Sequence, residues 1–283
     1  MTSADAQPQN VAQCLHQAHA LGLARVDAQI LMLHCVGQAL HNRAWLMTHD
    51  ENPLTPSQQS SWQRALARRL KGEPVAYITG QKDFFGLTLS VDPRVLDPRP
   101  DTEALVEWAL ELLPAESRLR VLDLGTGSGA VALALQHQRP HCEVNAVDAS
   151  EDALQVAQAN AQRLKLPVHF VRSHWMNAVQ GRFDLIVSNP PYVAEGDVHL
   201  AALAHEPLQA LTSGPDGLQD IAQIVSQAPQ HLNKGCWLLL EHGWDQAPAV
   251  QNLLSKAGFL GVQTRQDLAG VDRCTGGYFE SER

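Results

Sequence analysis

From about residue 102 onward, short apolar runs alternate with amphipathic segments, and this alternation constrains the fold more than any other feature of the sequence. The expected strands are 120–124, 143–147, 168–171, 183–187 and 237–241, and the expected helices are 130–136, 152–164, 220–232 and 245–257. Such alternation is typical of an α/β domain whose mostly parallel sheet is covered by helices on both faces. Ligands bind such sheets beyond the carboxyl ends of the strands, so we expect the functional site in the loops after Leu124, Val147 and Val187.

The first part of the chain follows a different pattern. Apolar residues recur at helical spacing from about residue 10 to residue 71, and Thr55-Pro56 begins the last expected helix there. From Pro74 onward, Val75, Tyr77 and Ile78 and then the run 84–91 suggest the strands of a hairpin, and the proline-rich turns up to residue 100 are a stretch that can line a site. The sequence therefore predicts a helical domain over 1–73, a β-hairpin linker over 74–100 and the α/β domain over 101–283.

Composition argues against several functional classes. Lys and Arg number 21 against 30 Asp and Glu, and the net charge of −9 repels a phosphate backbone, so no direct nucleic-acid partner is expected. No apolar run approaches the roughly 18 residues of a membrane helix, and the first residues lack a signal-peptide pattern, so we expect a cytoplasmic protein without membrane contact. The five cysteines and 13 histidines are scattered without ligand spacing, so neither disulfides nor a metal are expected.

A glycine-rich string, Asp123-Leu124-Gly125-Thr126-Gly127-Ser128-Gly129, joins an expected strand to an expected helix. Glycine permits positive φ and close approach of a ligand to the backbone, and the helix N-terminus offers free N–H groups. Asp148 ends the next strand, 19 residues after Gly129, where its carboxylate can accept hydrogen bonds from both hydroxyls of a ribose. Together these residues predict a site for a nucleoside cofactor.

The glycine pattern alone fits more than one cofactor. Gly125-x-Gly127-x-x-Ala130, followed by an acid about 20 residues later, also satisfies the dinucleotide fingerprint, so a nicotinamide-dependent dehydrogenase stays open as an alternative. The tight spacing of the glycines favours S-adenosylmethionine, and so does Asp123, which could bind the cofactor's ammonium group directly or through water.

A second string, Asn189-Pro190-Pro191-Tyr192, follows an apolar strand. Consecutive prolines have fixed φ and donate no backbone hydrogen bond, so this loop is stiff and presents bare carbonyls. If the Asn189 side-chain oxygen and the Pro190 carbonyl accept the N–H bonds of a planar NH2 group, they hold its nitrogen toward a sulfonium methyl and stabilise the growing positive charge. Tyr192 can pack against the planar group.

These strings resemble motifs I and IV of Rossmann-like class I methyltransferases that act on planar nitrogens. Further blocks resemble the release-factor glutamine methyltransferase family, and with the two motifs they cover nearly the whole chain. These blocks are Tyr77 to Gly80, Phe85 to Leu87, Val95 to Glu103, Glu206-Pro207, Gly214 to Leu218 and Asp267 to Arg273.

The resemblance implies methylation of the glutamine side-chain amide nitrogen in the Gly-Gly-Gln motif of class I peptide chain release factors, with S-adenosyl-L-methionine as cofactor. It also implies a small all-α N-terminal domain for substrate recognition, a β-hairpin linker and a class I methyltransferase domain. We expect the enzyme to act as a monomer.

The motifs also assign site residues by position. Asn189, Pro190 and Tyr192 would be catalytic, and the same residues with Pro191 would bind the glutamine amide. Residues 125–129 would hold the methionine part of the cofactor, Asp148 the ribose, and Trp175 would pack near the adenine. The full expected cofactor set is Asp123, Gly125, Thr126, Gly127, Ser128, Gly129, Asp148, Trp175 and Asn189.

The chain departs from the family pattern at His174, where the family often has Asp, and at Asp97, where an apolar residue is more usual. The string at 99–103 favours the release-factor enzymes over ribosomal-protein glutamine methyltransferases, which stay open as an alternative. A nucleic-acid adenine amino-methyltransferase and a non-enzymatic binder of the cofactor also stay open. Glu241-His242-Gly243 follows an apolar strand, and we expect a structural role for it.

Overall fold

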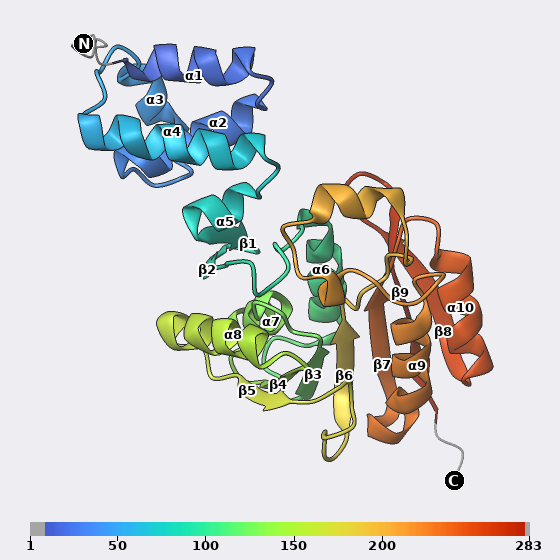
Figure 1. The fold of residues 1–283 in the computed structure, drawn as a ribbon. Coiled ribbons are helices and arrows are strands. Elements are labelled where there is room, and N and C mark those ends of the chain that lie inside the picture. Colours follow the sequence, from blue (N-terminus) through green and yellow to red (C-terminus); the bar gives the residue numbers. More distant parts are fainter. Residues whose placement is uncertain (1–8, 281–283) are drawn as a thin grey trace. The chain divides into compact units, whose positions relative to one another are not determined.

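The computed structural model describes residues 9–280 (Figure 1). The chain divides into two compact units, Met1–Gly80 and Gln81–Arg283. Residues 9–80 fold into helices, which are α1 (Val11–Ala20), α2 (Arg25–Val36), α3 (Arg43–Thr48), α4 (Pro56–Leu70) and α5 (Val75–Thr79). Helices α1 and α4 both begin with a capping box, in which Asn10 pairs with Gln13 and Thr55 with Gln58. The predicted all-α N-terminal part is confirmed.

The segment after Pro74 differs from the prediction. The apolar pattern at Val75 to Ile78 predicts a strand, and this prediction is wrong, because Val75–Thr79 is helix α5. The φ angle of Pro74 is −56°, which suits entry into a helix, and Gly80 ends the helix in the left-handed conformation with φ of 74°. These start and stop signals outweigh the strand preference of the side chains between them.

The predicted hairpin is confirmed over Gln81–Ser90. Its strands β1 (Gln81–Phe84) and β2 (Leu87–Ser90) are antiparallel, with Phe84 opposite Leu87. The connecting Phe85 and Gly86 have φ of 47° and 78°, and positive φ at both positions is the geometry of the tight turn that matches strand twist.

Within residues 91–280, the strands form one seven-stranded sheet in the order β5-β4-β3-β6-β7-β9-β8 (Figure 1). They are β3 (Arg120–Leu124), β4 (Glu143–Asp148), β5 (His169–Arg172), β6 (Phe183–Ser188), β7 (Leu232–Glu241), β8 (Phe259–Gln266) and β9 (Asp272–Phe279). Strands β3 to β7 pair in parallel, and β9 pairs antiparallel with β7 and β8. The mostly parallel sheet of the predicted α/β fold is confirmed.

Helices cover both faces of this sheet. They are α6 (Glu103–Leu112), α7 (Ala130–Gln138), α8 (Glu151–Leu164), α9 (Gln219–His231) and α10 (Ala247–Lys256), with short 3-10 turns at Pro100–Thr102, Val198–Leu203 and Leu208–Ala210. Ile224 of α9 and Leu254 of α10 share a core with Leu122 of β3, whereas α7 approaches Asp123, which points to the opposite face. No helix within residues 9–280 is long and apolar enough to span a membrane.

Strands β8 and β9 are absent from the predicted set. Strand β9 contains Gly276 and Gly277, and glycine within a strand weakens the strand signal. The structure shows why Gly276 has no side chain: a Cβ there would lie 2.5 Å from Leu239 Cδ2 and 3.0 Å from Trp108 Cη2. The close packing of α6 on β7 and β9 thus requires glycine at position 276. The same glycine weakens the strand pattern in the sequence, which is why β9 was not predicted.

Candidate active site

The glycine loop turns the chain from β3 into α7. Gly125, Gly127 and Gly129 have φ of 69°, 54° and 84°, a region that side chains other than glycine rarely adopt. Thr126 N–H donates to the Val147 carbonyl at 2.9 Å, which ties the loop to the end of β4. The loop therefore lies at the carboxyl edge of the sheet, as the sequence predicts.

Asp123 lies beneath this loop rather than at its surface. Its side chain is buried, and Oδ2 accepts hydrogen bonds from Thr126 Oγ1 at 2.6 Å and from Ala132 N–H at 3.2 Å. Burial raises the pKa of Asp123 to about 7, although these hydrogen bonds oppose the shift. In this position the carboxyl group joins the loop to the first turn of α7.

Asp148 ends β4 and faces the same edge. Oδ2 accepts from Gly127 N–H and Oδ1 from Ser150 N–H, each at 2.9 Å, so the backbone fixes the orientation of the carboxylate. Burial raises the pKa of Asp148 above its usual range, against the effect of these hydrogen bonds. Each oxygen keeps a further lone pair with which it can accept a ligand hydroxyl.

Trp175 closes the space beside the loop. Its backbone has φ of 47°, and its indole N–H donates to Asp220 Oδ1 at 3.0 Å. A Cβ built on Gly125 would lie 3.3 Å from Trp175 Cζ3 and 4.0 Å from the Asn189 carbonyl oxygen. The glycine loop, the indole and the Asn-Pro-Pro-Tyr segment thus meet at Gly125.

The Asn-Pro-Pro-Tyr segment begins where β6 ends. Ser188 Oγ donates to the Leu124 carbonyl at 2.8 Å, which links the segment to β3. Asn189 Nδ2 donates to Thr102 Oγ1 at 3.1 Å, and the Tyr192 hydroxyl donates to Glu241 Oε1 at 3.3 Å. Thr102, directly before α6, therefore holds Asn189, and Glu241 at the end of β7 holds Tyr192.

These elements enclose a cavity of about 390 Å³, a size typical of sites for small molecules. The predicted site residues that line it are Gly125, Gly127, Asp148, Trp175, Asn189 and Pro191. The predicted residues outside its lining are Asp123, Thr126, Ser128, Gly129, Pro190 and Tyr192. Within residues 9–280, no group of three or more His, Cys, Asp or Glu side chains is placed to hold a metal ion.

Sequence analysis did not single out every residue of the cavity wall. Additional lining residues include Arg94, Leu96, Ser150, Pro207, Gln209 and Thr212. The expectation that the proline-rich stretch up to residue 100 lines a site is confirmed by Arg94 and Leu96, and the Glu206-Pro207 block was the signal that could have pointed to the lining residues near it. His174 also lines the cavity beside Trp175, so this departure from the family pattern lies in the cavity wall.

Asp97, the second departure, is buried among charges. Lys82 Nζ lies 3.1 Å from Asp97 Oδ1, and Arg99 lies 3.9 Å from Oδ2. Arg99 also forms an ion pair with Glu206 at 2.5 Å, which joins the segments that contribute Leu96 and Pro207 to the cavity. These partners account for an acid where an apolar residue is more usual.

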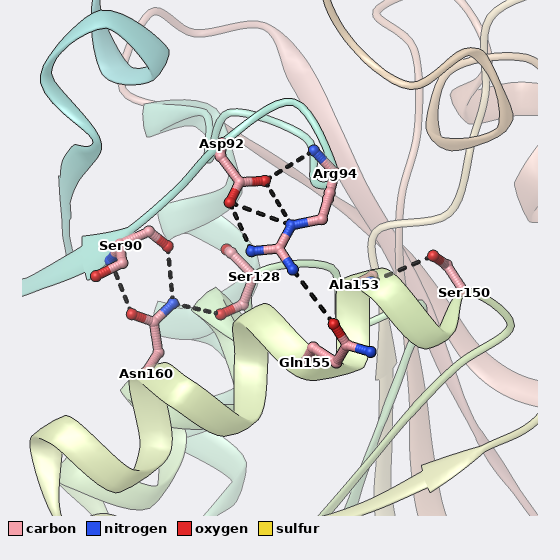
Figure 2. Close-up of polar contacts among 8 residues, drawn as sticks. All are labelled: Ser90, Asp92, Arg94, Ser128, Ser150, Ala153, Gln155 and Asn160. Carbon is pink, nitrogen blue, oxygen red and sulfur yellow. Dashed lines mark hydrogen bonds and ion pairs between the residues drawn. The ribbon is translucent and has the colours of Figure 1, made fainter.

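One buried amide connects the hairpin with the glycine loop. Asn160 lies on the covered face of α8, accepts from Ser90 N–H at 2.7 Å, and donates to the carbonyls of Ser90 at 2.9 Å and Ser128 at 3.0 Å (Figure 2). Figure 2 also shows Arg94, which pairs with Asp92 at 2.7 Å and reaches Gln155 of α8. The segment from Ser90 to Arg94 is thus hydrogen-bonded to α8 at two positions, Asn160 and Gln155.

The chain resembles known methyltransferases over nearly its whole length. Residues 9–80 match the PrmC N-terminal domain, and residues 102–242 match the methyltransferase small domain. The release factor glutamine methyltransferase of Bordetella pertussis is 48% identical over 261 residues, covering 91% of this chain and 96% of that protein. The protein of the same name from Escherichia coli is 44% identical over 273 residues, covering 95% of this chain and 97% of that one.

Solved structures support the fold. A methyltransferase from Pyrococcus furiosus superposes with a TM-score of 0.56 at 22% identity, covering 78% of this chain and 100% of that chain. With identities near 45% over nine-tenths of its length, the chain belongs to the release factor glutamine methyltransferase family.

Proposed function

We propose that this protein methylates the side-chain amide nitrogen of the glutamine in the Gly-Gly-Gln motif of class I peptide chain release factors, using S-adenosyl-L-methionine. The observation that carries the proposal is the cavity whose lining includes Gly125, Asp148 and Asn189. Family membership supports the same activity.

The cavity residues fit the cofactor. Asp148 presents a fixed carboxylate for the ribose hydroxyls, and the absence of a side chain at Gly125 leaves the backbone open beside Trp175. When bound, S-adenosylmethionine supplies a sulfonium methyl group to the amide nitrogen, leaving S-adenosylhomocysteine and a proton as the further products. Asp123 supports the loop from below, and Thr126, Ser128 and Gly129 give the loop its shape.

Asn189 and Pro190 would hold the substrate amide. A planar amide nitrogen is a weak nucleophile because its lone pair is delocalised, so the enzyme must fix its position and stabilise the positive charge that develops on it. Asn189 Nδ2 is engaged by Thr102, which leaves Oδ1 as the acceptor for one N–H of the substrate. The Pro190 carbonyl would accept the second N–H, with Pro191 and Tyr192 forming the neighbouring wall.

The acidic surface favours a protein substrate over a nucleic acid, because binding to phosphates requires a basic face. We propose that the N-terminal domain over 1–73 contacts the release factor beyond its tip and that residues 74–100 act as linker to the methyltransferase domain over 101–283. We also propose that the enzyme acts as a cytoplasmic monomer. Light scattering of the protein alone and with its substrate tests the stoichiometry.

The direct test is methyl transfer from labelled S-adenosylmethionine to a purified class I release factor and to its Gly-Gly-Ala variant. We expect label on the native factor alone. Duplex DNA and a ribosomal protein fraction are run in parallel, and label on either would assign the substrate to nucleic acid or to a ribosomal protein. Cofactor binding without label on any of these substrates would favour a non-enzymatic role.

Asn189→Ala tests the role of the amide. We expect turnover to fall at least about 100-fold, as for the removal of a transition-state hydrogen bond in an oxyanion hole, while the Kd for S-adenosylmethionine stays within about threefold. Asn177→Ala is the matched control, because this exposed side chain only accepts from Gln227 at 3.0 Å. Unchanged turnover in Asn189→Ala would refute the assigned role.

A further inference from the structure

Two glycine-containing blocks of the sequence, Gly214 to Leu218 and Glu241 to Gly243, do not line the cavity. Both blocks meet at Gln246, the residue directly before α10. Gly243 N–H donates to Gln246 Oε1 at 2.8 Å, and Gln246 Nε2 donates to the Asp216 carbonyl at 3.3 Å. One side-chain amide therefore joins the loop after β7 to the loop before α9.

The same amide reaches the Asn-Pro-Pro-Tyr segment. Gln246 Nε2 also donates to the Tyr192 carbonyl at 3.0 Å. All three partners of this amide are backbone groups, and a backbone N–H can only donate whereas a backbone carbonyl can only accept. The orientation of the Gln246 amide is therefore fixed by the geometry, with Oε1 on the N–H and Nε2 between the two carbonyls.

Glycine leaves the space that this arrangement needs. Gly217 has φ of 75°, and a Cβ there would lie 2.2 Å from the Tyr192 carbonyl oxygen and 2.8 Å from Gln246 Nε2. At Gly243 a Cβ would lie 3.0 Å from Gln246 Oε1. A side chain at position 217 would thus displace the Tyr192 carbonyl from the amide, which gives the Gly214 to Leu218 block a role in the placement of Tyr192.

The peptide unit between Tyr192 and Val193 is held on both sides. Its carbonyl accepts from Gln246, and its N–H, which belongs to Val193, donates to the Leu211 carbonyl at 2.9 Å. The two prolines before it have no N–H through which the backbone could be fixed. The position of the Pro190 carbonyl therefore depends on how the two ends of the segment are held, at Asn189 and at this peptide unit.

We propose that Gln246 is a positioning residue that holds the Asn-Pro-Pro-Tyr segment from outside the cavity, so that Asn189 and the Pro190 carbonyl face the substrate nitrogen in a fixed geometry. Gln246 does not line the cavity and acts only through the peptide unit that it holds. A misplacement of about 1 Å can cost about 100-fold in rate even when its origin is far from the reacting atoms. This inference rests on the proposed function, in which Asn189 and Pro190 accept the N–H groups of the substrate amide.

A glutamine series tests the positioning role. Gln246→Met removes the amide at similar length, and Gln246→Glu keeps an acceptor for Gly243 N–H but places a carboxylate oxygen against two carbonyl oxygens. Gln136→Met is the matched control, because this buried amide also donates to a backbone carbonyl, that of Pro140 at 3.3 Å, at the end of α7 opposite to the glycine loop.

We expect kcat at saturating release factor to fall at least about tenfold in both Gln246 variants, because a held segment loses a hydrogen bond that fixes its position. The Kd for S-adenosylmethionine should stay within about threefold of the wild type, and both quantities should do so in Gln136→Met. A kcat within threefold of the wild type in either Gln246 variant would overturn the proposal. So would a rise in Kd as large as the fall in kcat, because it would trace the effect to a general loss of the cavity.

A measurement without catalysis separates this inference from the proposed function. The backbone amide proton of Val193, followed by NMR, should exchange with water at least about tenfold faster in Gln246→Met than in the wild type, because the same peptide unit has lost its carbonyl partner. Exchange in Gln136→Met should match the wild type. If the wild type fails to methylate a release factor, the proposed function fails, whereas equal exchange in wild type and Gln246→Met would refute the hold of Gln246 on the segment.

Discussion

Replacing Asn160 by alanine should lower the free energy of unfolding by about 3 kcal/mol. The Asn160 side chain is fully buried, and its removal leaves Ser90 N–H, the Ser90 carbonyl and the Ser128 carbonyl without their partner. An unsatisfied buried group costs about 1–3 kcal/mol. Ser128 is buried and bears that cost fully, whereas the exposed position of Ser90 lets water replace part of its loss.

Asn160→Asp separates donor from acceptor contributions. The carboxylate still accepts from Ser90 N–H and from the Arg163 guanidinium, which donates to Asn160 Oδ1 at 3.1 Å, whereas the two hydrogen bonds donated to the carbonyls of Ser90 and Ser128 are lost. We therefore expect a loss of about 1–3 kcal/mol in Asn160→Asp. Urea unfolding followed by tryptophan fluorescence measures both, with the exposed Asn177→Ala as control, for which we expect less than about 0.5 kcal/mol. A loss below about 1 kcal/mol in Asn160→Ala would refute the assigned role of the amide. The Kd for S-adenosylmethionine should also rise about tenfold, because Ser128 belongs to the glycine loop.

Two further predictions concern the cofactor loop and the buried carboxyl group. Gly125→Ala should raise the Kd for S-adenosylmethionine at least about tenfold, because a Cβ there is strained at φ of 69° and lies 3.3 Å from Trp175 Cζ3. Calorimetric titration measures this Kd, and a value within twofold of the wild type would contradict the geometry. Burial raises the pKa of Glu241 from 4.5 to about 7. Between these two pH values the folded state keeps a proton that the unfolded state has released, so the free energy of unfolding falls as the pH rises and stops falling above pH 7. Between pH 5 and pH 8 the wild type should therefore lose about 2 kcal/mol of unfolding free energy relative to Glu241→Met, and parallel pH profiles in urea unfolding would contradict the shift.

Local patterns were sufficient to predict the framework of the site. The glycine loop, Asp148 and Asn189 follow parallel strands, and the carboxyl ends of parallel strands meet at one edge, so their proximity follows from the order of elements. The same reasoning fails for Val75–Thr79, because strand preference of the side chains competes there with helix signals at Pro74 and Gly80.

Contacts between distant segments were beyond the reach of sequence patterns. Thr102 and Glu241 reach the Asn-Pro-Pro-Tyr segment from 87 and 49 residues away, and only tertiary packing brings them there. Asp123 was expected to bind the cofactor's ammonium group, but its side chain points toward Ala132 and lies outside the cavity lining. The sequence does not show this direction, because it depends on how β3 packs in the sheet. The order of strands and loops in the sequence shows that a residue lies at the carboxyl edge of the sheet. Whether its side chain points into the cavity or into the core depends on the tertiary packing.

The bridge from Ser90 through Asn160 to Ser128 connects the hairpin and the cofactor loop through one side chain. Any interaction that orders the hairpin restricts the same amide that steadies the glycine loop, and linkage requires the effect to be reciprocal. A ligand that prefers the ordered hairpin must then raise cofactor affinity by the same factor by which the cofactor raises the affinity of that ligand. A change in the hairpin that breaks its hydrogen bonds to Asn160 would therefore alter the support of the glycine loop through one side chain of α8.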